Sequence, residues 1–284
     1  MQRAVGEALG SVVVDARSIG GGCINEAAAC TLADGRRVFV KHNPGADPRM
    51  FPAEARGLAW LAEPGALRVP TVLAVSDPDA DVSFIALELL EPGRPAADHD
   101  VALGRGLATL HRAAPPCFGL DHDNFLATLE QSNTASQDWP TFYAEQRLAP
   151  QVRLAVDHGH APHSWLRDFD RLCQRLPELA GPPEPPARLH GDLWSGNLHR
   201  DPRGAPALID PAVYGGHREI DLAMLTLFGS PGPRVFAAYH DIYPLDPAYP
   251  DRVGLYQLYP LLAHVNLFGA SYVPQVAAAL RPYL

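Results

Sequence analysis

The sequence predicts an α+β protein with two unlike lobes: a small antiparallel sheet with one helix over residues 1–91, and a larger, mainly helical lobe over residues 92–284. Short strand-like apolar runs dominate before residue 91, and longer runs with helical periodicity follow it. A segment containing proline and glycine, residues 91–95, separates the two patterns. A chain of 284 residues, 47% of them hydrophobic, is long enough to bury a sizeable core.

The first lobe is expected to contain a sheet and a single helix. Strands are predicted in the short apolar runs, which are residues 12–14, 27–32, 38–40, 69–75 and 82–90. A polar turn at 33–36 joins the second and third runs into a hairpin. The helix is expected at 49–63, where Phe51, Leu58 and Leu61 share one face and Pro52 suits the first turn.

The second lobe is expected to be helical because its apolar residues recur at helical spacing. The predicted helices are residues 101–112, 139–156, 164–179 and 219–228, with two more between 252 and the end of the chain. A proline-rich segment at 181–186 predicts a stiff, extended connector. That connector leads into the most informative motif of the sequence.

The composition argues against several classes of protein. The formal net charge is −9, so the chain has no basic field for nucleic acid or an anionic membrane surface, and neither partner is expected. The sequence has no apolar stretch of membrane-spanning length and no secretion signal, which predicts a cytoplasmic location. The four cysteines show no disulfide or zinc-site spacing, as expected of reduced thiols; they are Cys23, Cys30, Cys117 and Cys173.

The motif at 189–199 carries an acid and an amide at a spacing that indicates phosphoryl transfer. Asp192 and Asn197 are five residues apart, and Asp210 follows the next apolar run. Transfer to a hydroxyl needs one carboxylate to accept its proton, while an amide oxygen and a second carboxylate hold Mg²⁺ on the nucleotide phosphates. The spacing therefore predicts Asp192 as the catalytic base, and Asn197 and Asp210 as magnesium ligands.

The first lobe supplies residues suited to binding ATP. A glycine-rich loop between two predicted strands would let main-chain N–H groups approach phosphates. This loop contains Gly20, Gly21, Gly22 and Cys23. Lys41 ends the third predicted strand as a phosphate contact, and Glu54 lies in the helix, where it can pair with Lys41. Each feature alone is common, but their order together predicts a nucleotide site.

These motifs resemble those of the fructosamine kinases, or ketosamine-3-kinases, in the aminoglycoside- and choline-kinase branch of the protein-kinase-like fold. The resemblance covers essentially the whole chain and rests on residues 20–25, 38–41, 54–58, 190–197 and 209–223. It implies a bilobal protein-kinase-like fold, with ATP and Mg²⁺ as cofactors. The implied reaction is phosphorylation of the 3-hydroxyl of a ketosamine, a sugar joined to an amine by glycation. Such a deglycation repair kinase would act on a free ketosamine or on a glycated protein lysine.

The resemblance also suggests where the nucleotide base and the acceptor bind. Main-chain atoms at Glu88 and Leu90 would contact adenine. Trp194, two residues after the predicted base, has a flat ring suited to stacking on a sugar, although packing of the loop is an alternative. His217 and Glu219 could hydrogen-bond the hydroxyls or the amine of the acceptor.

Asp221 lies at the start of an apolar helix and, unlike His217 and Glu219, is assigned a structural role. It is expected to be a helix cap or a buried partner of the catalytic loop. A position among the ligand-binding side chains is the less favoured interpretation.

Two other functions remain open at this stage. One is a related phosphotransferase that acts on an aminoglycoside or a choline-like amine. The other is a nucleotide-binding pseudokinase, which the presence of Lys41, Asp192, Asn197 and Asp210 disfavours.

A last expectation concerns the cysteine of the glycine-rich loop. Cys23 lies where main-chain N–H groups and Lys41 would favour the thiolate. We therefore predict a redox-sensitive thiol that could link two chains as a homodimer. A small residue chosen only to fit the loop is the alternative.

Overall fold

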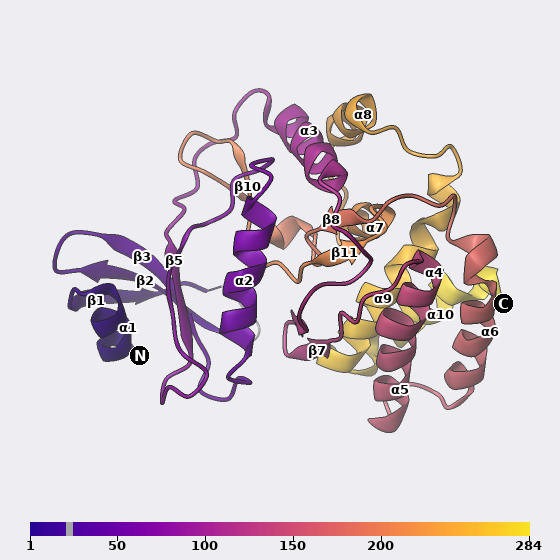
Figure 1. Ribbon diagram of the computed structural model, residues 1–284, viewed down its shortest axis with the longest axis horizontal. Helices are drawn as coiled ribbons and strands as arrows, with labels where there is room; N and C mark the ends of the chain where they lie inside the picture. Colours follow the sequence, from indigo (N-terminus) through magenta and orange to yellow (C-terminus); the bar gives the residue numbers. More distant parts are fainter. Residues whose placement is uncertain (21–24) are drawn as a thin grey trace.

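The computed structural model describes residues 1–20 and 25–284 and has the predicted bilobal α+β architecture (Figure 1). The sheet-containing first lobe, drawn in indigo and purple, lies beside the larger helical lobe. The last strand of the sheet ends at Glu88 and the first helix of the second lobe begins at His99. The boundary predicted after residue 91 falls between these two points.

A five-stranded antiparallel sheet forms the first lobe, in the order β1-β2-β3-β5-β4. The strands are β1 (Val13–Ser18), β2 (Glu26–Leu32), β3 (Arg37–His42), β4 (Val72–Val75) and β5 (Phe84–Glu88). Because successive side chains of a strand point to opposite faces, β5 contributes to two apolar clusters. Phe84 packs on one face of the sheet, and Ile85 packs on the other.

Two helices cover the two faces of this sheet, so the expectation of a single helix was wrong. The helices are α1 (Gln2–Leu9) and α2 (Met50–Ala62). α1 is short, and only Val5 and Gly6 in it are fully buried. Its apolar face is therefore too small to stand out in the sequence. α2 buries Phe51 and Leu58 against the opposite face of the sheet, as predicted.

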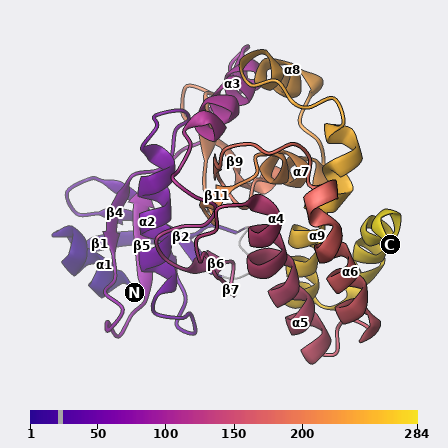
Figure 2. The same cartoon turned by 45° about the vertical axis from the view of Figure 1, so that its right-hand side comes forward.

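The second lobe is mainly helical, with three two-stranded sheets (Figure 2). Its α-helices are α3 (His99–Arg112), α4 (Trp139–Phe142), α5 (Ala149–Asp157), α6 (Ser164–Leu179), α7 (Glu219–Leu227), α8 (Pro233–Ile242), α9 (Tyr249–Phe268) and α10 (Val273–Leu280). The strand pairs are β6 (Asn124–Leu126) with β7 (Leu129–Gln131), β8 (Ala187–Leu189) with β11 (Tyr214–Gly216), and β9 (Leu198–Arg200) with β10 (Pro206–Leu208).

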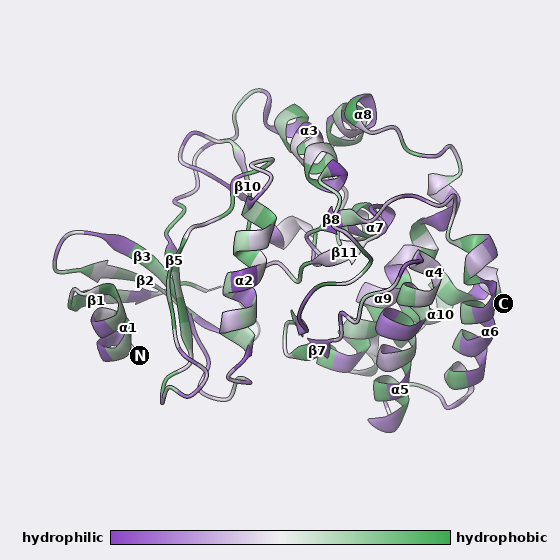
Figure 3. Ribbon diagram, in the orientation of Figure 1, coloured by the Kyte–Doolittle hydropathy of each residue, from purple (hydrophilic) through white to green (hydrophobic). Residues whose placement is uncertain are grey.

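Most predicted helices of this lobe are confirmed. The helix expected at 139–156 is continuous, but its middle, Tyr143–Leu148, is wound as a π-helix. α6 shows the amphipathic pattern clearly, with Phe169 and Leu172 buried and charged residues outside (Figure 3). α8 was not predicted because it has only 10 residues, so few of its positions carry the helical pattern.

The two lobes share part of one apolar core. Leu61, from the last turn of α2, belongs to the same buried cluster as Leu107 of α3 and Leu193 of the loop after β8. α2 therefore packs on the sheet and on the second lobe at once. In the part of the chain that the structure describes, no helix is both long and apolar enough to cross a membrane.

Candidate active site

The segment after β8 is held in place by buried hydrogen bonds from α7. Asp221 accepts the main-chain N–H groups of His190 at 2.7 Å and Gly191 at 3.0 Å. Gly191 has φ +81° and lies against the main chain of Ala212, so a side chain would clash there. The expectation that Asp221 is a buried partner of the catalytic loop is confirmed.

Asp192 and Asn197 point toward each other at the end of this segment. The Asn197 Nδ2 group donates to Asp192 Oδ2 at 2.8 Å and to the Asp192 main-chain oxygen at 2.9 Å. Burial raises the pKa of Asp192 to about 7, with further repulsion from Asp210 and Asp221, while the bond from Asn197 opposes the shift. A carboxylate with a pKa near neutrality is suited to accepting a proton.

Lys41, Glu54 and Asp210 meet between the lobes. Lys41 Nζ lies 2.6 Å from Glu54 Oε1 and 2.6 Å from Asp210 Oδ1, although Asp210 is 169 residues away in sequence. Burial alone would lower the pKa of Lys41, but attraction to the two carboxylates raises it above its usual range. Lys41 is therefore a permanent cation facing the catalytic segment.

The oxygen donors in this site fit a hard divalent cation. Asp210 has φ +55°, a strained backbone conformation for a residue with a side chain. Its side chain is 45% exposed, whereas the side chains of Lys41 and Glu54 are 7% and 13% exposed. A carboxylate turned toward open space beside the amide of Asn197 is a donor set that Mg²⁺ prefers.

The two other predicted nucleotide-binding segments are placed only in part. Gly20 is exposed, and among the residues that the structure describes none lies within 4 Å of the position that a Cβ would take there. Gly21, Gly22 and Cys23 lie outside the described residues.

Glu88 and Leu90, the residues predicted to contact adenine through their main chain, have other partners within the protein. The Glu88 carboxylate forms an ion pair with Arg68. The carbonyl of Leu90 already accepts a hydrogen bond from His199 Nε2 at 2.8 Å. His199 of β9 therefore ties the segment after Asn197 to the chain that follows β5.

Trp194 is placed at the surface of the catalytic segment. Its side chain lies over Gly196, where a Cβ would clash with the ring, and the residue is 36% exposed. This arrangement gives a physical reason for glycine in the Trp-Ser-Gly sequence. The exposure leaves part of the Trp194 side chain open to solvent, and the stacking of its ring on an acceptor sugar stays a prediction.

His217 and Glu219 do not line the site, and their assignment as acceptor contacts is corrected. His217 is 2% exposed and stacks on Tyr256 with 5.4 Å between ring centroids. Burial lowers the pKa of His217 to about 4, so the ring is neutral. Glu219 is fully buried and forms two hydrogen bonds with Arg252, at 2.6 and 2.8 Å. Both side chains serve the packing of α7.

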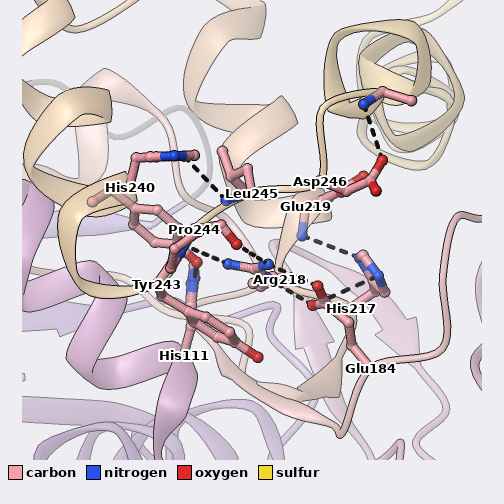
Figure 4. Close-up of polar contacts among 12 residues, drawn as sticks. His111, Glu184, His217, Arg218, Glu219, His240, Tyr243, Pro244, Leu245 and Asp246 are labelled. Atoms are coloured by element: carbon pink, nitrogen blue, oxygen red, sulfur yellow. Dashed lines mark hydrogen bonds and ion pairs between the residues drawn. The ribbon is translucent and has the colours of Figure 1, made fainter.

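The neighbouring Arg218 belongs to the same buried network (Figure 4). It makes two 2.7 Å contacts with Glu184 and donates to the carbonyl oxygens of Tyr243 and Pro244. Glu184 lies in the proline-rich connector, so this network joins the connector to the start of α7 and to the segment after α8.

Two residues that support the catalytic segment, His111 and Tyr239, were not predicted. His111 lies 3.3 Å from Asp221 through Nε2 and 2.8 Å from the Tyr239 hydroxyl through Nδ1. The sequence does contain one indication that His111 is buried: it lies four residues after Leu107, on the apolar face of its helix. A polar residue at such a position needs a buried partner.

Comparison with known proteins identifies the family. The model of the fructosamine kinase family matches residues 1–284. The chain belongs to the fructosamine kinase family. A chloroplastic protein-ribulosamine 3-kinase of Oryza sativa subsp. japonica is 37% identical over 94% of this chain and 78% of its own length. A Synechocystis protein provisionally named a ketoamine kinase is 38% identical over 96% of this chain and 91% of its own.

Solved structures agree with this membership. A Thermobifida fusca protein, provisionally assigned as a fructosamine-3-kinase, matches with a TM-score of 0.90 and 38% identity, covering 99% of this chain and 97% of its own. The choline kinase LicA from Streptococcus pneumoniae matches with a TM-score of 0.67 and 16% identity, covering 99% and 98%. The second match shows the fold alone, and both confirm a protein-kinase-like architecture.

Proposed function

We propose that this fructosamine kinase family member phosphorylates the 3-hydroxyl of a ketosamine with ATP. The observation that carries the proposal is the convergence of Lys41, Glu54 and Asp210 beside the Asp192–Asn197 pair. The names of the relatives, a protein-ribulosamine 3-kinase and ketoamine kinases, support this acceptor class. The wider sequence resemblance would also admit an aminoglycoside or a choline-like amine.

Each polar residue of the site has a role that follows from its position. Asp192, buried and with a raised pKa, accepts the proton of the acceptor hydroxyl. Asn197 orients Asp192 through its Nδ2 group. Lys41 is held by Glu54, so its charge is directed at the nucleotide phosphates.

The cofactor is magnesium-ATP, which supplies the phosphoryl group when bound. Asp210 and Asn197 are the residues that would hold the metal ion, because a carboxylate and an amide supply the oxygen ligands that Mg²⁺ prefers. The two residues are neighbours, since the Asn197 Nδ2 group lies 3.4 Å from the main-chain oxygen of Asp210. Asp210 combines a φ of +55° with a carboxylate that lies 2.6 Å from Lys41 of the first lobe, which places it between the lobes.

The proposal is tested by measuring ADP release with a ketosamine, an aminoglycoside and choline in parallel. We expect turnover with the ketosamine and a product phosphorylated at the 3-hydroxyl.

Asp192→Asn should lower kcat by roughly 10²-fold or more while nucleotide binding is kept, because the proton acceptor is lost and the shape is retained. Asp157→Asn, an exposed change at the end of α5, is the matched control and should keep wild-type rates. Turnover with only an aminoglycoside or choline, or with none of the three, would overturn the assignment.

The redox-linked homodimer through Cys23 stays a prediction. Cys30, Cys117 and Cys173 are free thiols in the described part of the chain. Burial raises the pKa of Cys30, and burial raises that of Cys173 to about 11, so both are poor nucleophiles. Limited alkylation followed by peptide mapping should therefore label Cys23 before these two.

A further inference from the structure

Five aromatic side chains form a continuous surface that starts at the catalytic segment. This aromatic strip consists of Trp194, Phe228, His264, Phe268 and Tyr272. Ring centroids are 6.1 Å apart between Trp194 and Phe228, 4.7 Å between Phe228 and His264, and 5.4 Å between His264 and Phe268. The strip begins two residues after Asp192 and continues along the ends of α7 and α9, which lie side by side (Figures 1 and 2).

Three of the five members of the strip are exposed although they are apolar, while His264 and Tyr272 are partly buried. Trp194 is 36% exposed, Phe228 38% and Phe268 46%, and each belongs to the few large hydrophobic residues that the folded chain leaves open. Contiguous apolar surface that remains exposed commonly marks a binding site. Its continuity with Trp194 places this surface next to the acceptor hydroxyl rather than on a remote face.

Neighbouring rings of the strip are inclined to one another, so both ring faces and ring edges lie along it. The Trp194 and Phe228 ring planes are inclined by 80°, and Phe228 and His264 by 45°. Several aromatic walls at different angles can surround a small cation, because the negative faces of the rings attract it. A neutral sugar hydroxyl gains less from such an arrangement than an ammonium group does.

His264 adds an acceptor in the middle of the strip. Its Nδ1 lies 2.7 Å from the carbonyl oxygen of Pro260, which can only accept, so Nδ1 carries the proton and Nε2 has the lone pair. Burial lowers the pKa of His264, which keeps the ring neutral. Nε2 can therefore accept a hydrogen bond from an N–H group.

The two segments that carry most of the strip favour a cation over an anion. Residues 219–232 and 253–280 supply every member of the strip except Trp194, and they contain no lysine or arginine. A positively charged ligand would thus meet no like charge from these segments. A phosphate or a carboxylate would find no basic side chain there to pair with.

We propose that the aromatic strip binds the protonated amine of the acceptor, together with the first carbon atoms attached to that amine. The sugar then lies toward Trp194 and Asp192, and the amine substituent extends over Phe228, His264 and Phe268. This inference rests on the proposed function, because a ketosamine carries a secondary ammonium group beside its sugar. It makes the strip the determinant that separates ketosamines from uncharged sugars.

The test compares an N-alkyl ketosamine with its N-acetylated counterpart, whose nitrogen carries no charge. Wild-type enzyme should prefer the charged acceptor in kcat/KM by roughly 3- to 30-fold, as expected of a cation held by aromatic faces. Phe228→Leu and Phe268→Leu keep an apolar side chain but remove the aromatic face. Each should lower kcat/KM for the charged acceptor by roughly 3- to 10-fold and leave the neutral acceptor and the KM for ATP unchanged.

Two further variants separate the proposed contact from packing. Phe228→Tyr retains the ring and should keep the preference for the charged acceptor. Ile242→Ala removes a side chain of similar exposure, 37%, at the end of α8, and should change neither acceptor.

The outcomes distinguish this inference from the proposed function. Equal losses on both acceptors in Phe228→Leu, or no loss on either, would overturn the amine site while ketosamine turnover stands. Turnover with an aminoglycoside or choline but with no ketosamine would overturn both proposals.

Discussion

Lys41 is a buried cation between two carboxylates, and its removal should leave one of them without compensation. Lys41→Met strands the Glu54 carboxylate, whose side chain is 13% exposed, next to Asp210. We expect a loss of about 3 kcal/mol in the free energy of unfolding, together with loss of activity. Adding Glu54→Gln removes the stranded charge, so the double variant should regain much of the stability and none of the activity. Urea unfolding of the single and double variants measures both effects; equal stability of the two would contradict this account.

His217 gives the folded protein a pH dependence of known sign. Burial lowers its pKa to about 4 from 6.5, so in acid the unfolded chain binds a proton before the folded protein does. The stabilising effect is full above pH 6.5 and is lost as the pH falls toward 4. The contribution is about 3 kcal/mol in the free energy of unfolding.

Comparison with a non-titrating variant isolates this contribution. His217→Gln should flatten the profile of unfolding free energy between pH 4 and 6.5. The substitution also removes the ring that stacks on Tyr256, which lowers the stability at every pH. The slope, rather than the absolute stability, is therefore the quantity to compare. Parallel profiles for the two proteins would show that His217 is not the group that titrates.

At the level of single residues, the sequence predicted which side chains phosphoryl transfer needs better than it predicted which side chains are buried. Phosphoryl transfer demands a set of side chains that could be predicted together from the sequence, and the structure brings its members into contact. They are Lys41, Glu54, Asp192, Asn197 and Asp210. His217 and Glu219 carry equally reactive groups in the next motif, yet they are buried. Burial depends on what packs above a residue, and the partners Tyr256 and Arg252 come from a distant helix, α9.

At the level of elements, α2 is attached to the second lobe by a residue that the sequence analysis missed. Arg188 of β8 donates to the carbonyl oxygen of Trp60 and to Glu63 at the end of α2, and its guanidinium lies 4.3 Å from the centre of the Trp60 ring. The same helix carries Glu54, which holds Lys41. Arg188 thus fixes the helix that positions the phosphate-binding lysine.

Replacing this arginine should affect both stability and nucleotide use. We expect Arg188→Met to cost about 2 kcal/mol in unfolding free energy, since a carbonyl and a carboxylate lose a charged donor. It should also raise the KM for ATP more than the KM for the acceptor. Arg188→Lys should restore only part of the unfolding free energy and only part of the wild-type KM for ATP, because one ammonium group cannot replace the planar guanidinium. Arg68→Ala, which removes a half-exposed ion pair with Glu88, is the control and should cost under about 1 kcal/mol. An equal rise in the KM for ATP and the KM for the acceptor would contradict a specific role of Arg188 in placing Lys41 and would indicate a general loss of structure.

Strong periodicity decided which elements could be predicted. α6 was found at its observed bounds because apolar residues recur on one face over its 16 residues. α1 and α8 have 8 and 10 residues, so few positions carry the pattern. The π-helical turn at Tyr143–Leu148 depends on tertiary contacts: the fully buried Arg147 lies 3.9 Å from the Tyr214 ring centre and donates to Asn133 at 2.6 Å.

At the level of the whole molecule, the fold could be predicted because its two lobes differ in period and follow each other in sequence. The site between them could be predicted only as a set of residues. Lys41 and Asp210 touch because α2 packs on both lobes, and no local pattern shows that contact. The aromatic strip was missed for the same reason, since it joins a loop, the end of α7 and the end of α9.

A site divided between the lobes implies that its ligand stabilises both together. Magnesium-ADP at 100 times its Kd should add about 2.7 kcal/mol to the unfolding free energy, a rise in Tm of about 5 °C for a chain of this size. Part of this rise should need Mg²⁺, because Asp210 and Asn197 belong to the second lobe while Lys41 belongs to the first. Asp210→Asn should remove the magnesium-dependent part and keep the part that ADP gives alone, since the carboxylate ligand is lost and the fold is not. Thermal unfolding with ADP, with Mg²⁺ and with both separates these parts, and an unchanged magnesium-dependent rise in Asp210→Asn would exclude this carboxylate as a metal ligand.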